Sequence, residues 1–300
     1  MRILGAWPGA AEPRTEPSLQ TGAALMLIGC GILTINDALM KALVAQMPVG
    51  QAVALRGAVG VVLTLAVAPL MGGFRTLLPK KPKAAGLLTG LLICNLFLFP
   101  TSLRYIPLAD AIMLAYLSPL VVVALSPWIL GEAVGWRRWS AVVVGLIGAA
   151  LVIDPGGGDL HPALLAPIVV AVIVGLRDML TRKFIHGENT LALVMLANLG
   201  AAVVGLASLP VGWTPLAGDA VWLLLSAGAL LTISQFMLAA SFRYADAAIL
   251  SCLKYSSIVW AAGLGWVFWG ESLALNDWIG AALIVFAGVL ITLRTPRAKP

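Results

Sequence analysis

Two aspartates in the chain are each followed, four residues later, by a basic residue inside a long apolar stretch. Asp37 precedes Lys41, and Asp178 precedes Arg182. Residues four apart lie on one face of a helix, so each pair brings opposite charges together. A charged group at the centre of a bilayer costs ~2.5–3.5 kcal/mol on insertion scales and therefore faces a partner or a wet cavity. These four residues are candidates for charge pairs that gate a passage, and the structural alternative is a pair that neutralises itself within its helix.

Two further basic residues, Arg56 and Lys254, also lie inside apolar stretches. If successive stretches cross a membrane in alternating directions, Asp37, Lys41 and Arg56 lie toward the outer surface. Asp178 and Lys254 then lie toward the inner surface. Two such sets suit two gates that open alternately on either side of a central site.

Aromatic and amide side chains inside apolar stretches are the candidates for substrate contacts. Aromatic rings attract cations and stack on planar groups, and a buried amide requires a hydrogen-bond partner. The structural alternative is that the amides bind neighbouring helices and the rings pack in the interior. The predicted substrate-binding residues are Tyr116, Tyr255, Trp260, Asn95, Gln235 and Lys254.

Nothing in the sequence predicts a catalytic centre, a metal site or a bound cofactor. The three cysteines, Cys30, Cys94 and Cys252, lie far apart, and neither histidine belongs to a metal-binding motif. A membrane enzyme would require a nucleophile with its base or a metal cluster, and we expect no enzyme. A non-transporting scaffold stays open as an alternative and would show no uptake and no ligand-dependent thermal shift.

The composition predicts an integral membrane protein built only from α-helices. Hydrophobic residues make up 61% of the 300 residues and charged residues 11%, against ~25% charged in an average globular domain. The mean hydropathy is +1.00. A bilayer-crossing helix needs ~20 mostly apolar residues. Ten such segments are expected, at 21–46, 50–71, 84–103, 109–131, 137–153, 162–183, 190–210, 219–242, 247–269 and 275–294.

The basic residues predict the orientation of these segments. With both termini in the cytoplasm, fourteen of the nineteen Lys and Arg residues lie on the inside, and the outside loops hold only Arg104. The remaining four lie within the segments. Cytoplasmic loops carry the excess of Lys and Arg, so the net charge of +6 reflects orientation rather than nucleic-acid binding. We expect a multi-pass protein of the inner membrane, in contact with lipid.

The chain contains an internal repeat. An offset of 139 residues places Tyr116 on Tyr255 and Gly131-Glu132 on Gly270-Glu271, and an offset of 141 places Asp37 on Asp178. Five segments per half invert the second half relative to the first, which is typical of secondary transporters. The predicted organisation is a tail (1–20), a first five-helix repeat (21–155), a second five-helix repeat (160–295) and a short tail (296–300). The two glutamates are interpreted as structural.

The duplication and the Gly-Glu dipeptide after the fourth and ninth segments resemble the drug/metabolite transporter superfamily, in its EamA branch. The stretches Asn36-Asp37-Ala38-Leu39-Met40-Lys41, Arg177-Asp178 to Lys183 and Lys254-Tyr255 are similar to bacterial S-adenosylmethionine uptake transporters. This resemblance implies a secondary transporter for a small polar organic metabolite such as an amino acid or S-adenosylmethionine. A riboflavin-like vitamin carrier or an exporter of aromatic metabolites is the alternative.

Overall fold

The computed structural model describes residues 19–129, 131, 134–154, 161–184, 189–216, 218–241, 244–245 and 247–293. This part of the chain is all-helical and has no strand. The α-helices are α1 (Leu19–Gln46), α2 (Val49–Val67), α3 (Pro82–Leu103), α4 (Leu108–Ala115), α5 (Ser118–Ile129), α6 (Trp136–Ile153), α7 (Leu165–Phe184), α8 (Thr190–Leu206), α9 (Gly218–Ser241), α10 (Ala247–Lys254), α11 (Ser256–Trp269) and α12 (Leu275–Leu293). Four short 3₁₀ helices are η1 (Ala68–Met71), η2 (Phe74–Leu77), η3 (Pro162–Leu164) and η4 (Leu209–Val211).

The helices begin and end close to the boundaries expected from hydropathy. Within the described residues, seven helical stretches are long and apolar enough to cross a membrane, and two shorter ones, Leu191–Leu206 and Leu275–Ile291, are also apolar. The outside of the bundle carries large apolar side chains, and Val62, Trp222 and Phe286 each expose more than half of their surface. Such a surface is suited to lipid, and continuous helices satisfy their own backbone hydrogen bonds there. The protein is a multi-pass membrane protein.

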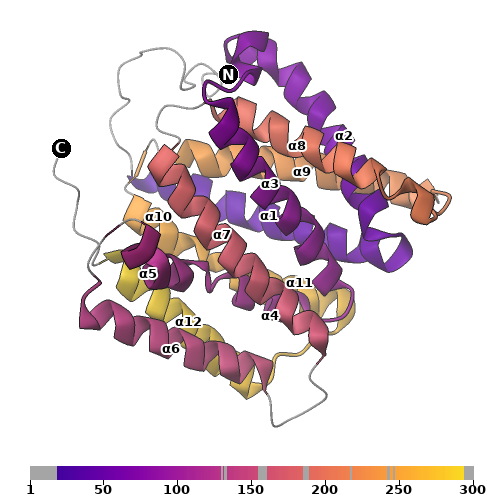
Figure 1. The fold of residues 1–300 in the computed structure, drawn as a ribbon. Coiled ribbons are helices and arrows are strands. Elements are labelled where there is room, and N and C mark those ends of the chain that lie inside the picture. Colours follow the sequence, from indigo (N-terminus) through magenta and orange to yellow (C-terminus); the bar gives the residue numbers. More distant parts are fainter. Residues whose placement is uncertain are drawn as a thin grey trace.

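The main helix contacts join the two halves of the chain. Helix α1 packs on α9, α3 on α7, α2 on α8, and α6 on α12; the last pair lies side by side in Figure 1. Glycines allow these close approaches. A Cβ atom on Gly148 of α6 would lie 2.7 Å from the carbonyl oxygen of Gly280 on α12, and one on Gly280 would lie 2.6 Å from that of Gly148.

Two of the expected membrane segments are interrupted. The fourth is divided into α4 and α5 at Tyr116, and the ninth is divided into α10 and α11 at Tyr255. At both positions the helical bonds tighten locally, with Leu117 N donating to Leu114 O and Tyr255 N donating to Cys252 O. Pro119 accounts for the first interruption, because proline has no N–H and its ring clashes with the preceding turn.

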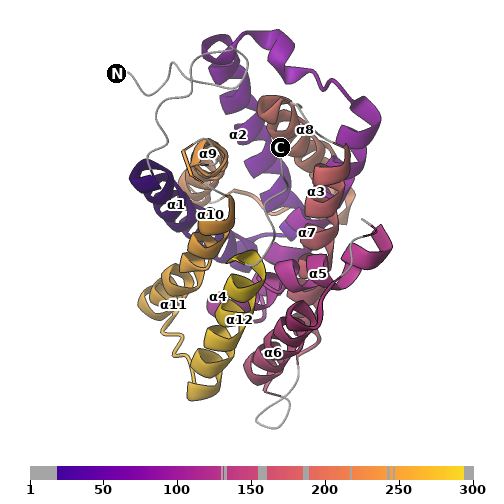
Figure 2. The ribbon, with the colours of Figure 1, turned by 90° about the vertical axis from the view of Figure 1, so that its left-hand side faces the viewer.

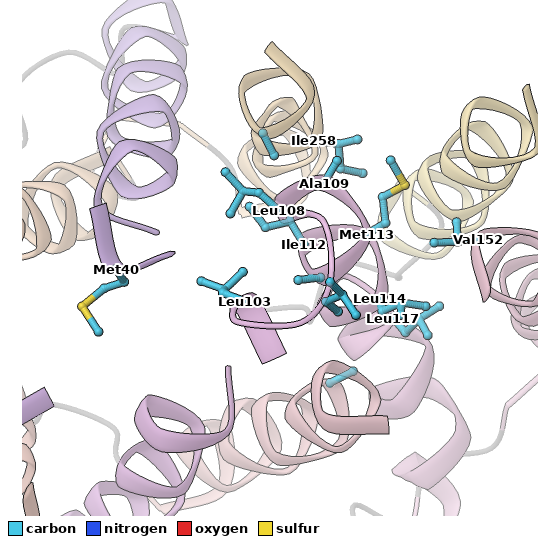
Figure 3. Close-up of a cluster of buried hydrophobic side chains, with 14 of the residues drawn as sticks. Met40, Leu103, Leu108, Ala109, Ile112, Met113, Leu114, Leu117, Val152 and Ile258 are labelled. Atoms are coloured by element: carbon cyan, nitrogen blue, oxygen red, sulfur yellow. The ribbon is translucent and has the colours of Figure 1, made fainter. Parts of the chain in front are cut away.

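Helix α4 is the most enclosed element of the fold. Figure 2 shows it in the middle of the bundle, and it contacts α6, α7 and α11. Six of its eight residues are buried. The close-up in Figure 3 shows Leu108, Ile112 and Met113 of α4 in one cluster with residues from α1, α6 and α11, which fixes α4 between the two halves of the chain.

Candidate functional site

The two tyrosines expected from the repeat meet in the interior. The ring centroids of Tyr116 and Tyr255 are 5.3 Å apart and the ring planes are inclined by 42°. Tyr116 caps the C-terminus of α4, and Tyr255 occupies the position between α10 and α11. Tyr255 is only 5% exposed, and its hydroxyl lies against Gly288 of α12. This hydroxyl is buried and makes no hydrogen bond within the described residues.

A second group of polar side chains comes from α1 and α2. The Nδ2 of Asn36 donates to Oδ1 of Asp37 over 3.0 Å. Asp37 interacts electrostatically with Arg56 on α2 and with Tyr116. Arg56 is 4% exposed, and its Nη2 is buried without a hydrogen-bond partner in the described part of the chain. A buried guanidinium nitrogen without a protein partner is unusual and indicates space for water or a ligand.

A third group belongs to α1 and to the junction of α10 and α11. Cys30 of α1 lies beside Ser256 and Ser257 and within electrostatic reach of Lys254. Tyr116 in turn lies beside Ser257. Tyr116 therefore adjoins both the Asp37 of the second group and the Ser257 of the third. The three groups form one polar region, which we call the central site.

Lys41 does not pair with Asp37, although both lie on one helix. Its ammonium bonds to Glu271 Oε1 and donates to the carbonyl oxygen of Ile106 over 3.1 Å. It also lies 5.3 Å from the ring centroid of Trp269. The expected pair within α1 is thus replaced by a pair between the two halves of the chain, because packing of the halves brings the carboxylate of Glu271 to the ammonium of Lys41.

Asp178 contacts the arginine that precedes it in the chain. Arg177 Nη2 lies 3.0 Å from Asp178 Oδ1, and both side chains are partly exposed. The side chain of Arg182 lies outside the described residues, as does Glu132.

The other three predicted substrate-binding residues, Trp260, Asn95 and Gln235, have no described contact with the tyrosine pair. Trp260 covers Gly31 of α1 and leaves 48% of its surface exposed, so it lies where α11 meets α1 rather than between the tyrosines. Asn95 on α3 and Gln235 on α9 are half-buried. No hydrogen bond described here ties these two amides to the aromatic pair, and their role in binding stays a prediction.

Sequence reasoning missed Asn36, Ser256 and Ser257 as polar neighbours of the tyrosines, and it interpreted Glu271 as structural. Asn36 precedes Asp37, and the two serines follow Tyr255, so their closeness in sequence to predicted site residues could have pointed to them. Nothing in the local sequence indicates the partner of Glu271. Its partner Lys41 is 230 positions away, and the repeat does not relate the two.

Comparison with known proteins identifies the family of the chain. The profile of the EamA-like transporter family matches the chain twice, over residues 20–154 and 161–294. The pseudopaline exporter CntI of Pseudomonas aeruginosa is 27% identical over 91% of this chain and 94% of its own. A riboflavin transporter of Rhizobium johnstonii is 31% identical over 63% of each chain. An S-adenosylmethionine uptake transporter of Rickettsia felis is 27% identical over 73% of this chain and 74% of its own.

A solved structure shares the fold. A protein crystal structure aligns with 93% of this chain and 99% of its own, with a TM-score of 0.66 and 22% sequence identity. The two matches of the family profile together cover most of the 300 residues. The chain belongs to the EamA-like transporter family, within the drug/metabolite transporter superfamily.

Proposed function

We propose that this protein is a secondary transporter that moves a small polar organic metabolite across the inner membrane by alternating access. The substrate class that fits best is zwitterionic, as in an amino acid or S-adenosylmethionine. The observation that carries this proposal is the buried Arg56, whose Nη2 has no partner among the described residues although Asp37 lies nearby. A membrane protein that holds an incompletely bonded guanidinium in its interior is suited to an anionic group from outside the chain.

The central site has one group for each charge of a zwitterion, the Arg56 guanidinium for the anion and the Asp37 carboxylate for the cation. A guanidinium binds a carboxylate through two parallel N–H···O bonds, which fixes the orientation of the substrate. Asp37 can then pair with an amino or sulfonium group, and the rings of Tyr116 and Tyr255 offer faces to a cation or a planar group. The serine side chains next to Tyr255 would bind the distal polar atoms of a longer substrate.

The architecture that we propose consists of ten membrane segments in two inverted five-helix repeats, 21–155 and 160–295, with both termini in the cytoplasm. Two observations support it. The contact of α1 with α9 has its counterpart in the contact of α7 with α3 once the halves are exchanged. The breaks at Tyr116 and Tyr255 also occupy equivalent repeat positions. Binding sites of such carriers form where the repeats meet, at interrupted helices.

A riboflavin-like vitamin or another aromatic metabolite is the second candidate substrate. The aromatic pair favours it, as does the similarity to a riboflavin transporter at 31% identity. The relatives differ in what their names say they carry, so similarity alone does not choose among these compounds. In either case we propose a carrier rather than an enzyme.

The deciding experiment is transport by the purified protein in proteoliposomes. Radiolabelled S-adenosylmethionine, a panel of amino acids and riboflavin are each tested for counterflow. We expect exchange of a zwitterionic compound and its loss in Arg56→Met, while the matched variant Arg75→Met, which removes an exposed arginine, keeps most of it. Exchange of riboflavin alone would favour the second candidate. If no panel compound exchanges, or if Arg56→Met transports normally, the proposal is wrong.

A further inference from the structure

The contacts of Glu271 join four separate parts of the chain at one end of the bundle. Its Oε1 binds the ammonium of Lys41 on α1, and its Oε2 accepts a hydrogen bond from Leu108 N over 3.0 Å. Lys41 also donates to Ile106 O, in the loop between α3 and α4. The end of α1, the 104–107 loop, the start of α4 and the 270–274 loop are thereby held together.

Glu271 also acts on α4 directly. Leu108 is the first residue of α4, where backbone N–H groups have no partner within the helix. A carboxylate at this position satisfies one of them and complements the positive end of the helix dipole. Helix α4 is eight residues long, so Tyr116 at its other end lies only about 12 Å away along the axis. A single rigid helix thus connects Glu271 to the aromatic pair of the central site.

The pair itself is suited to breaking and re-forming. Both side chains are largely withdrawn from solvent, with 11% of Lys41 and 19% of Glu271 exposed. Removing two charges from water offsets most of their mutual attraction, so a buried ion pair adds little net stability over apolar residues. Asp110, also on α4, has a buried Oδ1 without a hydrogen-bond partner in the described part of the chain, and it lies within electrostatic reach of Asp277, Glu271 and Lys41. Exchange of partners would therefore keep the charge of Lys41 compensated while the Glu271 contact opens.

We propose that the Lys41–Glu271 pair is a latch that closes the central site toward the end of the bundle formed by the 104–107 and 270–274 loops. Opening of that end requires the pair to break, and α4 transmits the change to Tyr116. Under the proposed topology this end faces the outside. The inference rests on the proposed function, but its test measures accessibility rather than transport, so the two can fail separately.

Cys30 provides the reporter. It is 1% exposed and lies beside Ser257 in the central site. With Cys94 and Cys252 replaced by serine, a membrane-impermeant maleimide is applied to intact cells and, separately, to inside-out vesicles. We expect Cys30 labelling from the latch side to be about tenfold faster in Lys41→Met and in Glu271→Gln than in the parent, and no faster from the opposite side.

These variants separate charge from structure. Methionine keeps much of the apolar stem of lysine, and glutamine at 271 still accepts the hydrogen bond from Leu108 N. The matched control is Arg104→Ala, which removes an exposed basic residue at the same end of the bundle. The double variant Lys41→Met with Glu271→Gln removes both charges of the pair, and its Cys30 labelling rate should match that of the single variants rather than exceed it, because both changes break the same contact.

Three results would overturn the latch. The first is unchanged Cys30 labelling in both single variants. The second is an equal increase in Arg104→Ala, which would indicate general loosening. The third is a double variant whose labelling rate increases by the product of the two single effects, which would show that the two residues act independently. Because size-exclusion profiles and thermal unfolding are recorded for each variant, a misfolded protein is recognised, and the comparison of the double variant with the well-folded single variant then decides the proposal.

Discussion

The rings of Tyr116 and Tyr255 lie 5.3 Å apart, although the two residues are 139 positions apart in the chain. Each tyrosine stands where a helix is interrupted, and each occupies the same position in its half of the repeat. An interrupted helix frees backbone groups in the interior, which is tolerated where the chain lines a cavity. The contact therefore places the two breaks together at the centre of the bundle, beside Asp37 and Ser257.

Removing the hydroxyl of Tyr255 tests whether it binds substrate. This hydroxyl has no hydrogen-bond partner in the described part of the chain, so Tyr255→Phe should change the free energy of unfolding by less than ~1 kcal/mol. A lost hydrogen bond of ~1–1.5 kcal/mol to substrate would raise the apparent KM about five- to tenfold. Transport kinetics at equal membrane expression measure this.

Tyr255→Ala removes the whole ring and should abolish transport, with protein still inserted in the membrane. The matched control is Tyr105→Phe, because the Tyr105 ring is exposed and stacks on His161. Wild-type kinetics in Tyr255→Phe and Tyr255→Ala would show that this tyrosine only packs.

Gly288 should be intolerant of any side chain. A Cβ atom there would collide with the hydroxyl and ring of Tyr255, so Gly288→Ala must displace Tyr255 or α12. Overpacking of this kind costs ~1–3 kcal/mol, and we expect a lower midpoint of thermal unfolding and reduced transport. Gly263→Ala is the control, since a Cβ atom at that position meets no neighbour within 4 Å. Adding Tyr255→Phe to Gly288→Ala should relieve the part of the loss of stability that comes from the hydroxyl; an additive effect of the two changes would exclude the hydroxyl as the colliding group.

Hydropathy was sufficient to place the helices because each apolar segment must supply its own backbone hydrogen bonds in lipid. The repeat was sufficient to single out Tyr116 and Tyr255. Pro119 is a sequence signal for the interruption at Tyr116, whereas no proline follows Tyr255 and its interruption has no such signal. The partner of Lys41 also could not be predicted from neighbouring positions in the sequence. Residues four apart on a helix suggested Asp37, but packing of the two halves brings Glu271 to the ammonium instead.

The topology can be tested at two exposed positions. The distribution of Lys and Arg places the end of α1 outside and the segment between α2 and α3 inside. In a cysteine-free background, Gln46→Cys should react with an impermeant maleimide in intact cells, and Lys80→Cys should react only after permeabilisation. Both side chains are exposed, so access to the reagent is limited by the membrane and not by packing. Labelling of position 80 but not of position 46 in intact cells would reverse the orientation.

Asp37 and Lys41 should behave differently, although both were predicted to belong to one outer gate. Asp37 lies with Arg56 and Tyr116 in the central site, whereas Lys41 bonds to Glu271 at the end of the bundle. Asp37→Asn should therefore abolish or strongly reduce transport by removing the partner of a cationic group. It should leave the labelling rate of Cys30 from outside close to that of the parent.

Lys41→Met should have the opposite pattern. It should speed the labelling of Cys30 from outside, while the central site still binds substrate. Substrate-dependent thermal shifts separate the two cases, because a variant with an intact central site still responds to ligand. If Asp37→Asn exposes Cys30 as strongly as Lys41→Met does, the aspartate is itself part of the closure. The division between a binding residue in the central site and a latch residue at its end would then be wrong.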